Sequence, residues 1–366
     1  MKKINKFVIL LLACTIFLVS CGKKEDIKVT ELVEETTVID ETDKEEEKED
    51  IRETEKIEET SIELKEELPR SLLSGLETTE ELSESPIIGI MLDNHPNARW
   101  QAGLREAELI YEIRVEGNTT RYLALFQVNN PSTIGPIRSA RTPFINRILE
   151  YDAVYLHYGA ASCVMNDIYN LGLNNINGIF VGQPVYYRNH NVGKVAPHNA
   201  YASMDGIREF MKNNGYPDKT EFVGYNFHDQ ASKPGGDKVE EFTLHIMPYN
   251  QTSYRYQAEE GIYHRYKDGI LQLDENDQEP LEVTNVIVQF ANGVLNPNGI
   301  HTDILDVGEG NGLFFSQGQV IDINWKKADR RAFTEYYDSE GEPLKLNIGQ
   351  TFIQVVDDYI TIDMDQ

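Results

Sequence analysis

GPIRSAR, at residues 135–141, joins an apolar run to a segment with a helical pattern. The run before it, YLALFQV at 122–128, indicates a buried strand. The segment after it, PFINRIL at 143–149, is typical of a helix with proline in its first turn. Because a Gly-Pro pair bends the chain, the stretch is predicted to form a strand-to-helix junction around which the first half of the body folds.

Two arginines, Arg138 and Arg141, lie within this junction. Free backbone N–H groups and the positive end of a helix dipole gather at such a place, and together with guanidinium groups they suit a phosphate or a carboxylate. The alternative is that both arginines form structural ion pairs with acids such as Glu112, Glu116 and Asp152. The sequence leaves both interpretations open.

The first 21 residues are typical of a bacterial lipoprotein signal peptide. Residues 1–6 carry three lysines, residues 7–19 form an apolar run, and Leu18-Val19-Ser20-Cys21 resembles a lipobox. The apolar run is too short to span a bilayer as a stable helix. We therefore expect Cys21 to be lipidated and to anchor the protein to the outer face of the cell membrane.

Residues 22–85 are predicted to be an acidic, disordered tether. They hold 24 acidic and 9 basic side chains, a net charge of 9 − 24 = −15 out of −27 for the whole chain. Such a segment cannot bury enough apolar surface to offset the entropy of ordering. The acidic balance disfavours nucleic acid as a partner.

The body is predicted to contain two domains that divide near Lys233-Pro234-Gly235-Gly236. Residues 86–235 alternate apolar strand-like runs with helix-like runs, which indicates an α/β domain with a mixed sheet. Residues 236–366 contain short β-like runs separated by Gly, Asn and Asp turns, which indicates a smaller β-rich domain. In the first domain we expect strands at 87–92, 109–115, 122–128 and 153–158, and helices at 143–149, 163–171 and 202–213.

Polar residues at strand ends supply candidate catalytic and binding groups. Asp93 and Asn94 follow the first strand, at the edge of the sheet where ligands bind in open α/β folds. Asp93 is a candidate for holding a metal or a proton, with an Asx turn as the alternative. Glu112, within the second strand, is a candidate general base or ligand of a divalent cation, with an internal ion-pair ladder as the alternative.

Four arginines, Arg105, Arg121, Arg138 and Arg141, are expected on loops near strand ends. Arginine is suited to bidentate contact with planar or tetrahedral anions, so we predict that they form a ligand-binding cluster, with Asn94 beside it. His198 is held by Pro197 and is a candidate general acid or anion donor.

Asn199, the next residue, is predicted to cap the helix that begins near Tyr201.

The body also resembles the YerB-like lipoproteins of Gram-positive bacteria. The matching stretches are Ile90-Met91-Leu92-Asp93-Asn94, Gly135–Arg141, Ala196-Pro197-His198-Asn199, Tyr263-His264-Arg265-Tyr266, Trp325-Lys326-Lys327 and Gly349-Gln350-Thr351. Asn189 and Lys194 depart from the family, which has an aspartate and an arginine there. The resemblance implies two domains on a lipid anchor and brings no established activity.

Two functions follow as hypotheses. In the first, the arginines hold an anionic envelope polymer or a lipid-linked precursor, with or without catalysis by Asp93, Glu112 and His198. In the second, the protein is a non-catalytic scaffold for another envelope protein, with tyrosines such as Tyr254 and Tyr263 exposed on the β-rich half. The chain lacks a nucleophile elbow, a phosphate-loop pattern and a histidine-pair metal motif, so no reaction, cofactor or metal is named.

Overall fold

The computed structural model describes residues 68–365 except for 118, 297–298 and 300. They belong to one compact unit, Leu64–Gln366. The signal peptide, Cys21 and most of the predicted tether lie outside the described residues. None of the helices in the described part of the chain is long and apolar enough to cross a membrane.

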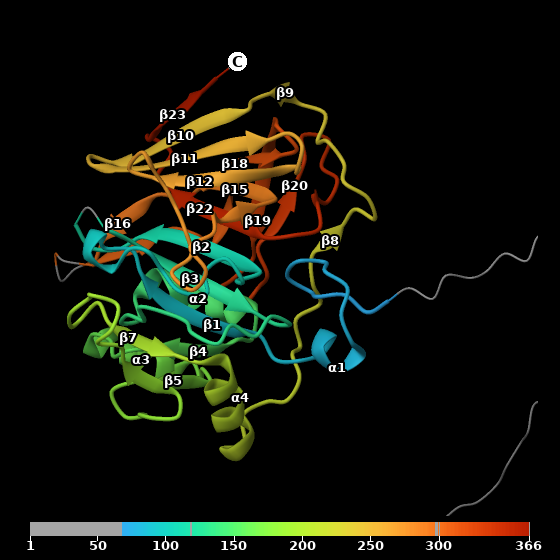
Figure 1. The fold of residues 1–366 in the computed structure, drawn as a ribbon. Coiled ribbons are helices and arrows are strands. Elements are labelled where there is room, and N and C mark those ends of the chain that lie inside the picture. Colours follow the sequence, from blue (N-terminus) through green and yellow to red (C-terminus); the bar gives the residue numbers. More distant parts are fainter. Residues whose placement is uncertain (1–67, 118, 297–298, 300, 366) are drawn as a thin grey trace, which may run out of the picture. The chain divides into compact units, whose positions relative to one another are not determined.

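A mixed sheet of 11 strands runs through both halves of the chain (Figure 1). Its hydrogen-bonded order is β20-β19-β18-β15-β22-β2-β3-β1-β4-β5, and β9 pairs with β19. The members from the first half are β1 (Ile88–Asp93), β2 (Leu109–Arg114), β3 (Thr120–Phe126), β4 (Val154–His157) and β5 (Asn175–Asn177). Those from the second half are β9 (Asp237–Lys238), β15 (Asn285–Phe290), β18 (Gly308–Ser316), β19 (Gln319–Lys327), β20 (Glu335–Tyr337) and β22 (Thr351–Val356).

The seam between the two halves is a backbone ladder. Strand β22 lies parallel to β2 on one side, with Thr351 opposite Leu109, and parallel to β15 on the other. The first half combines strands with helices and the second half is rich in strands, which confirms the predicted fold class. The sharing of one sheet across the two halves was not foreseen from the sequence.

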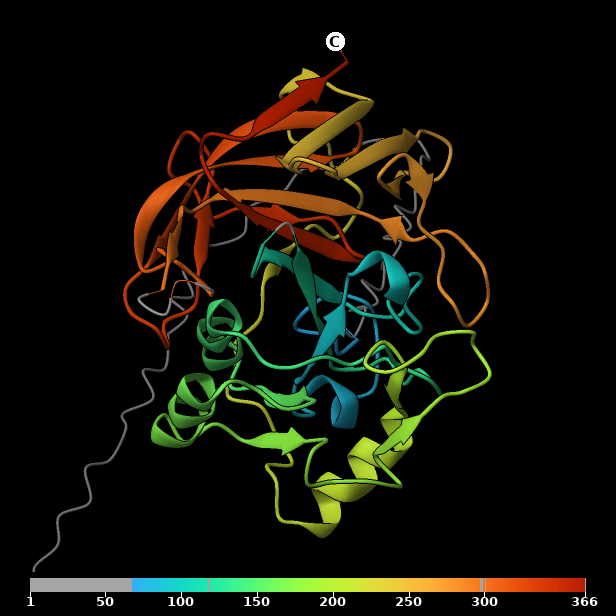
Figure 2. The same ribbon diagram turned by 90° about the vertical axis from the view of Figure 1, so that its left-hand side faces the viewer.

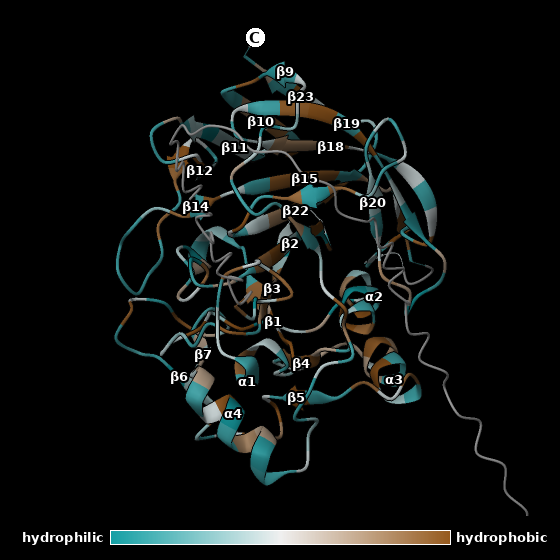
Figure 3. Cartoon of the chain, turned by 90° about the vertical axis from the view of Figure 1, so that its right-hand side faces the viewer, coloured by the Kyte–Doolittle hydropathy of each residue, from teal (hydrophilic) through white to brown (hydrophobic). Residues whose placement is uncertain are grey.

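Both faces of the central sheet are covered, and this explains its continuous apolar strands. Every residue of β1 and of β22 is buried, as expected where a sheet has layers on both sides. Ile90 and Phe352 belong to the core on one face, whereas Met91 and Ile353 belong to the core on the other. Figure 3 shows the resulting hydrophobic stretches in the central strands and on the helices beside them.

A second sheet of six strands packs against one face of the central sheet, seen at the top of Figures 1 and 2. Its strands alternate between buried and partly exposed residues, as a one-sided sheet requires. Tyr254 and Tyr263 point inward and are fully buried, so their predicted exposure was wrong. The strands are β10 (Glu241–Met247), β11 (Asn250–Gln257), β12 (Ile262–Lys267), β13 (Ile270–Leu271), β14 (Glu282–Val283) and β23 (Thr361–Met364).

Helices cover the remaining surfaces of the first half. Helix α2 and helix α3 pack on the face opposite the second sheet, and α4 lies against the other core. Ser203, not Asn199, caps α4 through its side chain, because the intervening residues form a short strand. The helices are α1 (Glu80–Ser83), α2 (Thr142–Glu150), α3 (Ser162–Asn170) and α4 (Met204–Asn213), with a 3-10 turn at Pro96–Ala98. Two-stranded ribbons are β6 (Tyr186–Arg188) with β7 (Ala200–Ala202), β8 (Asn226–Phe227) with β21 (Lys345–Leu346), and β16 (Gly293–Leu295) with β17 (Thr302–Ile304).

Residues 68–85 pack onto the body, so the predicted tether of 22–85 was too long at its C-terminal end. Leu73 is fully buried in the core beneath the helices. The hydroxyls of Ser71 and Ser74 donate to the buried Glu108 carboxylate, at 3.1 Å for Ser74. Burying a carboxylate without hydrogen bonds costs free energy, so the hydrogen bonds from these serines stabilise the packing of residues 68–85 on the body.

Candidate functional site

The junction at 135–141 lies across the carboxyl ends of β1 and β4, which are parallel. The Arg138 N–H donates to the carbonyl of Met91, and its carbonyl accepts from the Tyr158 N–H, both at 2.9 Å. Arg141 then occupies the N-cap position of α2. The predicted strand-to-helix junction is confirmed, and its backbone is fixed to both strands.

At this edge Asp93 connects two basic side chains that are far apart in the sequence. Its Oδ2 atom lies 2.7 Å from Nδ1 of His198 and 3.0 Å from Nε of Arg138. Its Oδ1 atom accepts the His95 N–H at 3.0 Å, and the His95 ring stacks on the His198 ring at 4.8 Å between centroids. We call Asp93, His95, Arg138 and His198 the Asp93 site.

The atoms of this site that remain available to a ligand are nitrogens of Arg138 and His198. The Arg138 side chain is 24% exposed and the His198 side chain 14% exposed, whereas Asp93 is buried. Among the described residues no partner contacts the Nη atoms of Arg138 or Nε2 of His198. Burial, together with the neighbouring His198, lowers the pKa of His95, which favours its neutral form. The site therefore offers a guanidinium edge and an imidazole nitrogen to a ligand.

Arg121 and Arg141 lie nearby but share a carboxylate. Nε of Arg141 donates to Oε2 of Glu116 at 2.7 Å, and Nη2 of Arg121 donates to Oε1 at 3.1 Å. Burial and the charge of Arg141 lower the pKa of Arg121 to about 10. Glu116 holds both guanidinium groups. The ion-pair alternative predicted this for Arg141 but not for Arg121, and both groups add positive potential next to Arg138.

Arg105 does not join the other three arginines. Its guanidinium lies 2.9 Å from Glu282 and 3.4 Å from Asp277, and the hydrogen bond that it donates to Glu282 raises its pKa. The loop that carries Arg105 precedes β2, at the end of that strand opposite to Arg114, and this separates it from the carboxyl end of β1. The predicted cluster of four arginines is thus a group of three.

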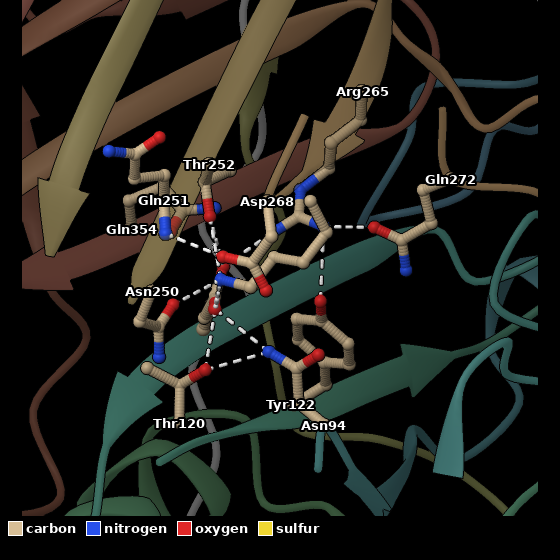
Figure 4. Close-up of polar contacts among 12 residues, drawn as sticks. Asn94, Thr120, Tyr122, Asn250, Gln251, Thr252, Arg265, Asp268, Gln272 and Gln354 are labelled. Atoms are coloured by element: carbon tan, nitrogen blue, oxygen red, sulfur yellow. Dashed lines mark hydrogen bonds and ion pairs between the residues drawn. The ribbon is translucent and has the colours of Figure 1, made fainter. Parts of the chain in front are cut away.

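Glu112 lies in a buried network between the two sheets, and Figure 4 shows the side chains around it. Its Oε1 atom accepts from Nζ of Lys267 at 2.7 Å and from Thr120 at 2.6 Å, and its Oε2 atom pairs with Arg265. All three charged side chains are fully buried. Asn94 extends to this side of the sheet and donates to Oε1 at 3.0 Å, so it faces away from the Asp93 site.

The electrostatics of this network are unsuited to a general base. Burial alone would raise the pKa of the Glu112 carboxyl, but the charges of Lys267 and Arg265 outweigh it and lower the pKa to about 2. Burial lowers the pKa of Lys267 to about 8. A carboxylate with so low a pKa accepts a proton poorly near neutral pH. We call Glu112, Arg265 and Lys267 the Glu112 network and assign it to the connection between the two halves.

Comparison with known proteins places the chain. Residues 73–217 match the family described as "Protein of unknown function (DUF3048) N-terminal domain", and residues 242–353 match its C-terminal domain. A protein of Bacillus subtilis (strain 168) named "Putative lipoprotein YerB" is 30% identical over 291 residues, which are 78% of this chain and 86% of that protein. The chain belongs to the DUF3048 family.

A solved member of the family shares the fold. The crystal structure of YerB from Bacillus subtilis matches with a TM-score of 0.72 and 27% identity, covering 80% of this chain and 99% of the crystallised one. The crystallised chain thus corresponds in extent to the compact unit described above, which supports independent folding of that unit. The relatives are described as a "putative lipoprotein" and as proteins of unknown function, so they assign no role to any side chain of this protein.

One basic residue near the Asp93 site was given no role by the sequence reasoning. Arg188, in β6, lies with its guanidinium carbon 4.7 Å from the ring centre of Tyr158 and donates to Asn199 Oδ1 at 3.0 Å. Among the described residues no carboxylate lies within ion-pair distance of it. The β6–β7 ribbon brings Arg188 into contact with Pro197 and Asn199, which flank His198, and the sequence pattern gave no sign of that pairing.

A cavity of about 830 Å³ lies elsewhere, along β18 and β19, and is lined by Asp322, Asn324 and Trp325 among others. Its acidic lining does not suit the anionic ligand that the arginines suggested. In the described residues no group of three or more His, Cys, Asp or Glu side chains is arranged to hold a metal ion.

Proposed function

We propose that this DUF3048 lipoprotein binds an anionic group of the cell envelope, a phosphate or a carboxylate, at the Asp93 site. In this proposal Cys21 carries the lipid and holds the protein at the outer face of the membrane. The observation that carries the proposal is the position of Asp93 Oδ2 between Arg138 and His198, which leaves the free nitrogens of both side chains on the exposed side.

Asp93 would act as a positioning residue in this site. Its carboxylate contacts His198 through Nδ1, so Nε2 of His198 remains available to a ligand. It contacts Arg138 through Nε, so the two Nη atoms of Arg138 also remain available, side by side. A guanidinium fork makes two parallel hydrogen bonds to a phosphate or carboxylate. Arg121 and Arg141 add positive potential, although Glu116 holds their side chains.

A local cationic edge matters more in an acidic protein. The chain has a net charge of −27, which repels anions at a distance. An anionic ligand is therefore held by short contacts, and these are the contacts that the Asp93 site offers. Candidate ligands are a phosphorylated or carboxylated wall polymer and a lipid-linked precursor. Glu112, Asn94 and Arg105 are left out of the proposed site because their contacts direct them elsewhere.

Isothermal titration of pyrophosphate into residues 22–366 tests the proposal. A charge-assisted hydrogen bond contributes about 1.5–3 kcal/mol, so Arg138→Gln should weaken binding about ten- to a hundredfold. Arg105→Gln is the matched control, since it removes an arginine that lies outside the site, and it should bind as wild type does. Equal affinity of all three proteins, or no binding by wild type, would refute the proposal.

The anchor has its own test. Cys21→Ala should leave the precursor unprocessed and without lipid, because the lipobox holds no other thiol. Labelling cells with a fatty acid and fractionating their membranes measures this directly. Label on the Cys21→Ala variant would contradict the proposed anchor.

A further inference from the structure

A cavity of about 450 Å³ lies beside the Asp93 site, and basic and apolar residues line it. Arg188, His190 and Lys194 supply the basic groups, and Val195 and Ala196 the apolar surface. No carboxylate is among its lining residues in the described chain. Asn199, the residue after His198, also lines the cavity, so it adjoins the proposed anion site.

Two basic groups of this cavity, Lys194 and Arg188, differ in whether a carboxylate already pairs with them. Nζ of Lys194 lies 3.0 Å from Glu275 and 3.2 Å from the Tyr201 hydroxyl, so its charge is compensated. Arg188 has no carboxylate within ion-pair distance among the described residues and touches only a ring, an amide and a carbonyl. Of these two cations, Arg188 is the one that a ligand can still pair.

Exposed apolar side chains border the same edge. Phe180 is 77% exposed, Val195 73% and Ile179 58%. Ile179 and Phe180 form the turn after β5, whose carboxyl end lies beside that of β4. Val195 is in the loop that leads to His198, and its carbonyl accepts the His198 N–H at 2.8 Å.

Arg188 connects the two apolar groups. Its guanidinium covers the ring of Tyr158, and a Cβ atom placed on Gly178 would lie only 2.5 Å from that same ring. Tyr158 thus lies against both Arg188 and the turn that carries Ile179 and Phe180, and Arg188 also lines the cavity together with Val195. An ionic head and an apolar body would find matching surfaces within one edge of the sheet.

We infer that the natural ligand of this edge is a lipid phosphate, with its phosphate between Arg138, His198 and Arg188 and its hydrocarbon on Phe180 and Val195. This inference rests on the proposed function and adds the apolar half of the ligand. When hydrocarbon packs on Phe180 and Val195, apolar surface of both the lipid and the protein is removed from water, which favours binding. A phosphate without a hydrocarbon chain lacks this contribution.

Two soluble probes with the same head separate the contributions: glycerol 3-phosphate and dihexanoyl phosphatidic acid. Titrated into residues 22–366, the lipid should bind at least about tenfold more tightly, since each buried methylene contributes about fourfold. Phe180→Ser should remove most of that gain and leave glycerol phosphate binding unchanged. Tyr249→Ser, at an exposed tyrosine in the β10–β11 turn, is the matched control and should change neither affinity.

The outcomes distinguish the two proposals. Equal affinities for both probes would overturn the lipid inference and leave the anion site standing. No binding of either probe would overturn both. Dihexanoyl phosphatidylcholine should bind weakly, because its phosphodiester head has no net charge. Binding equal to that of phosphatidic acid would show that the negative charge of the head is not recognised and would also overturn the inference. Arg188→Gln should weaken both phosphate probes.

Discussion

The Asp93 site and the Glu112 network are built from the same kinds of groups, a carboxylate between two basic side chains, yet they differ in what the basic groups can still do. In the Glu112 network the three charged side chains are fully buried, and Lys267 donates to three oxygen atoms. In the Asp93 site the carboxylate is buried while the basic side chains reach solvent. Burial and hydrogen-bond saturation, rather than residue type, separate a structural ion pair from a binding site.

The largest loss of stability should come from a substitution in the Glu112 network, the buried one of the two regions. Glu112→Gln leaves Arg265 and Lys267 facing each other without a carboxylate, and the loss of one partner of a buried pair costs about 3–5 kcal/mol. Urea unfolding followed by circular dichroism measures the change.

Glu282→Gln, which removes the partly exposed partner of Arg105, is the control and should cost under about 1 kcal/mol. A Glu112→Gln protein as stable as this control would show that the network does not hold the two halves together.

Acid should act on the same network. The carboxyl pKa of Glu112 is lowered from 4.5 to about 2 on folding. Between these values the unfolded chain binds the proton and the folded chain does not, so stability falls as the pH falls. The contribution is present above pH 4.5 and declines by about 3 kcal/mol toward pH 2.

The measurement is the difference in unfolding free energy between wild type and Glu112→Gln at pH 6 and at pH 3. The difference should shrink at pH 3. A constant difference across this range would contradict the lowered pKa of Glu112.

A smaller effect, on binding alone, should follow at the open site. Arg138→Lys keeps the charge and loses the fork, so pyrophosphate should bind about tenfold more weakly. Because the side chain is partly exposed, the melting temperature should stay within about one degree of wild type. Calorimetry and thermal unfolding on the same sample give both values. A marked fall in melting temperature would place Arg138 with the structural ion pairs instead.

The smallest effect should come from cutting the chain between the halves. Lys233 is exposed in the connection before β9, and a protease site inserted after it should be cleaved in the folded protein. The two fragments should still elute together, since β22 of the C-terminal fragment remains paired with β2 of the N-terminal one. Separation of the fragments without denaturant would contradict a shared sheet.

Local features of the first half could be predicted from the sequence, because periodicity and turn residues report short-range structure. The strand before GPIRSAR, the helix after it and the edge position of Asp93 follow from the apolar runs and the Gly-Pro bend. His198 was singled out, but its contact with Asp93 spans 105 residues, and no local pattern reports such a distance.

The pairing of distant segments could not be predicted. Glu112 meets Arg265 and Lys267 only because the second sheet packs over β2, so its role as a base was inferred without its partners. The same limit hid the β22–β2 seam, since the apolar run of β22 fits any buried strand. Arg188 was given no role, because its availability to a ligand depends on which described residues surround it in space, where no carboxylate lies within ion-pair distance.

The most direct test observes His198 itself, in residues 22–366 labelled with ¹⁵N at histidine. On addition of pyrophosphate the Nε2 resonance of His198 should shift and saturate, because this nitrogen faces the ligand, whereas the buried His157 should not move. In Arg138→Gln the same shift should need about ten- to a hundredfold more ligand. A saturating ligand that leaves His198 unchanged would contradict the assignment of the Asp93 site.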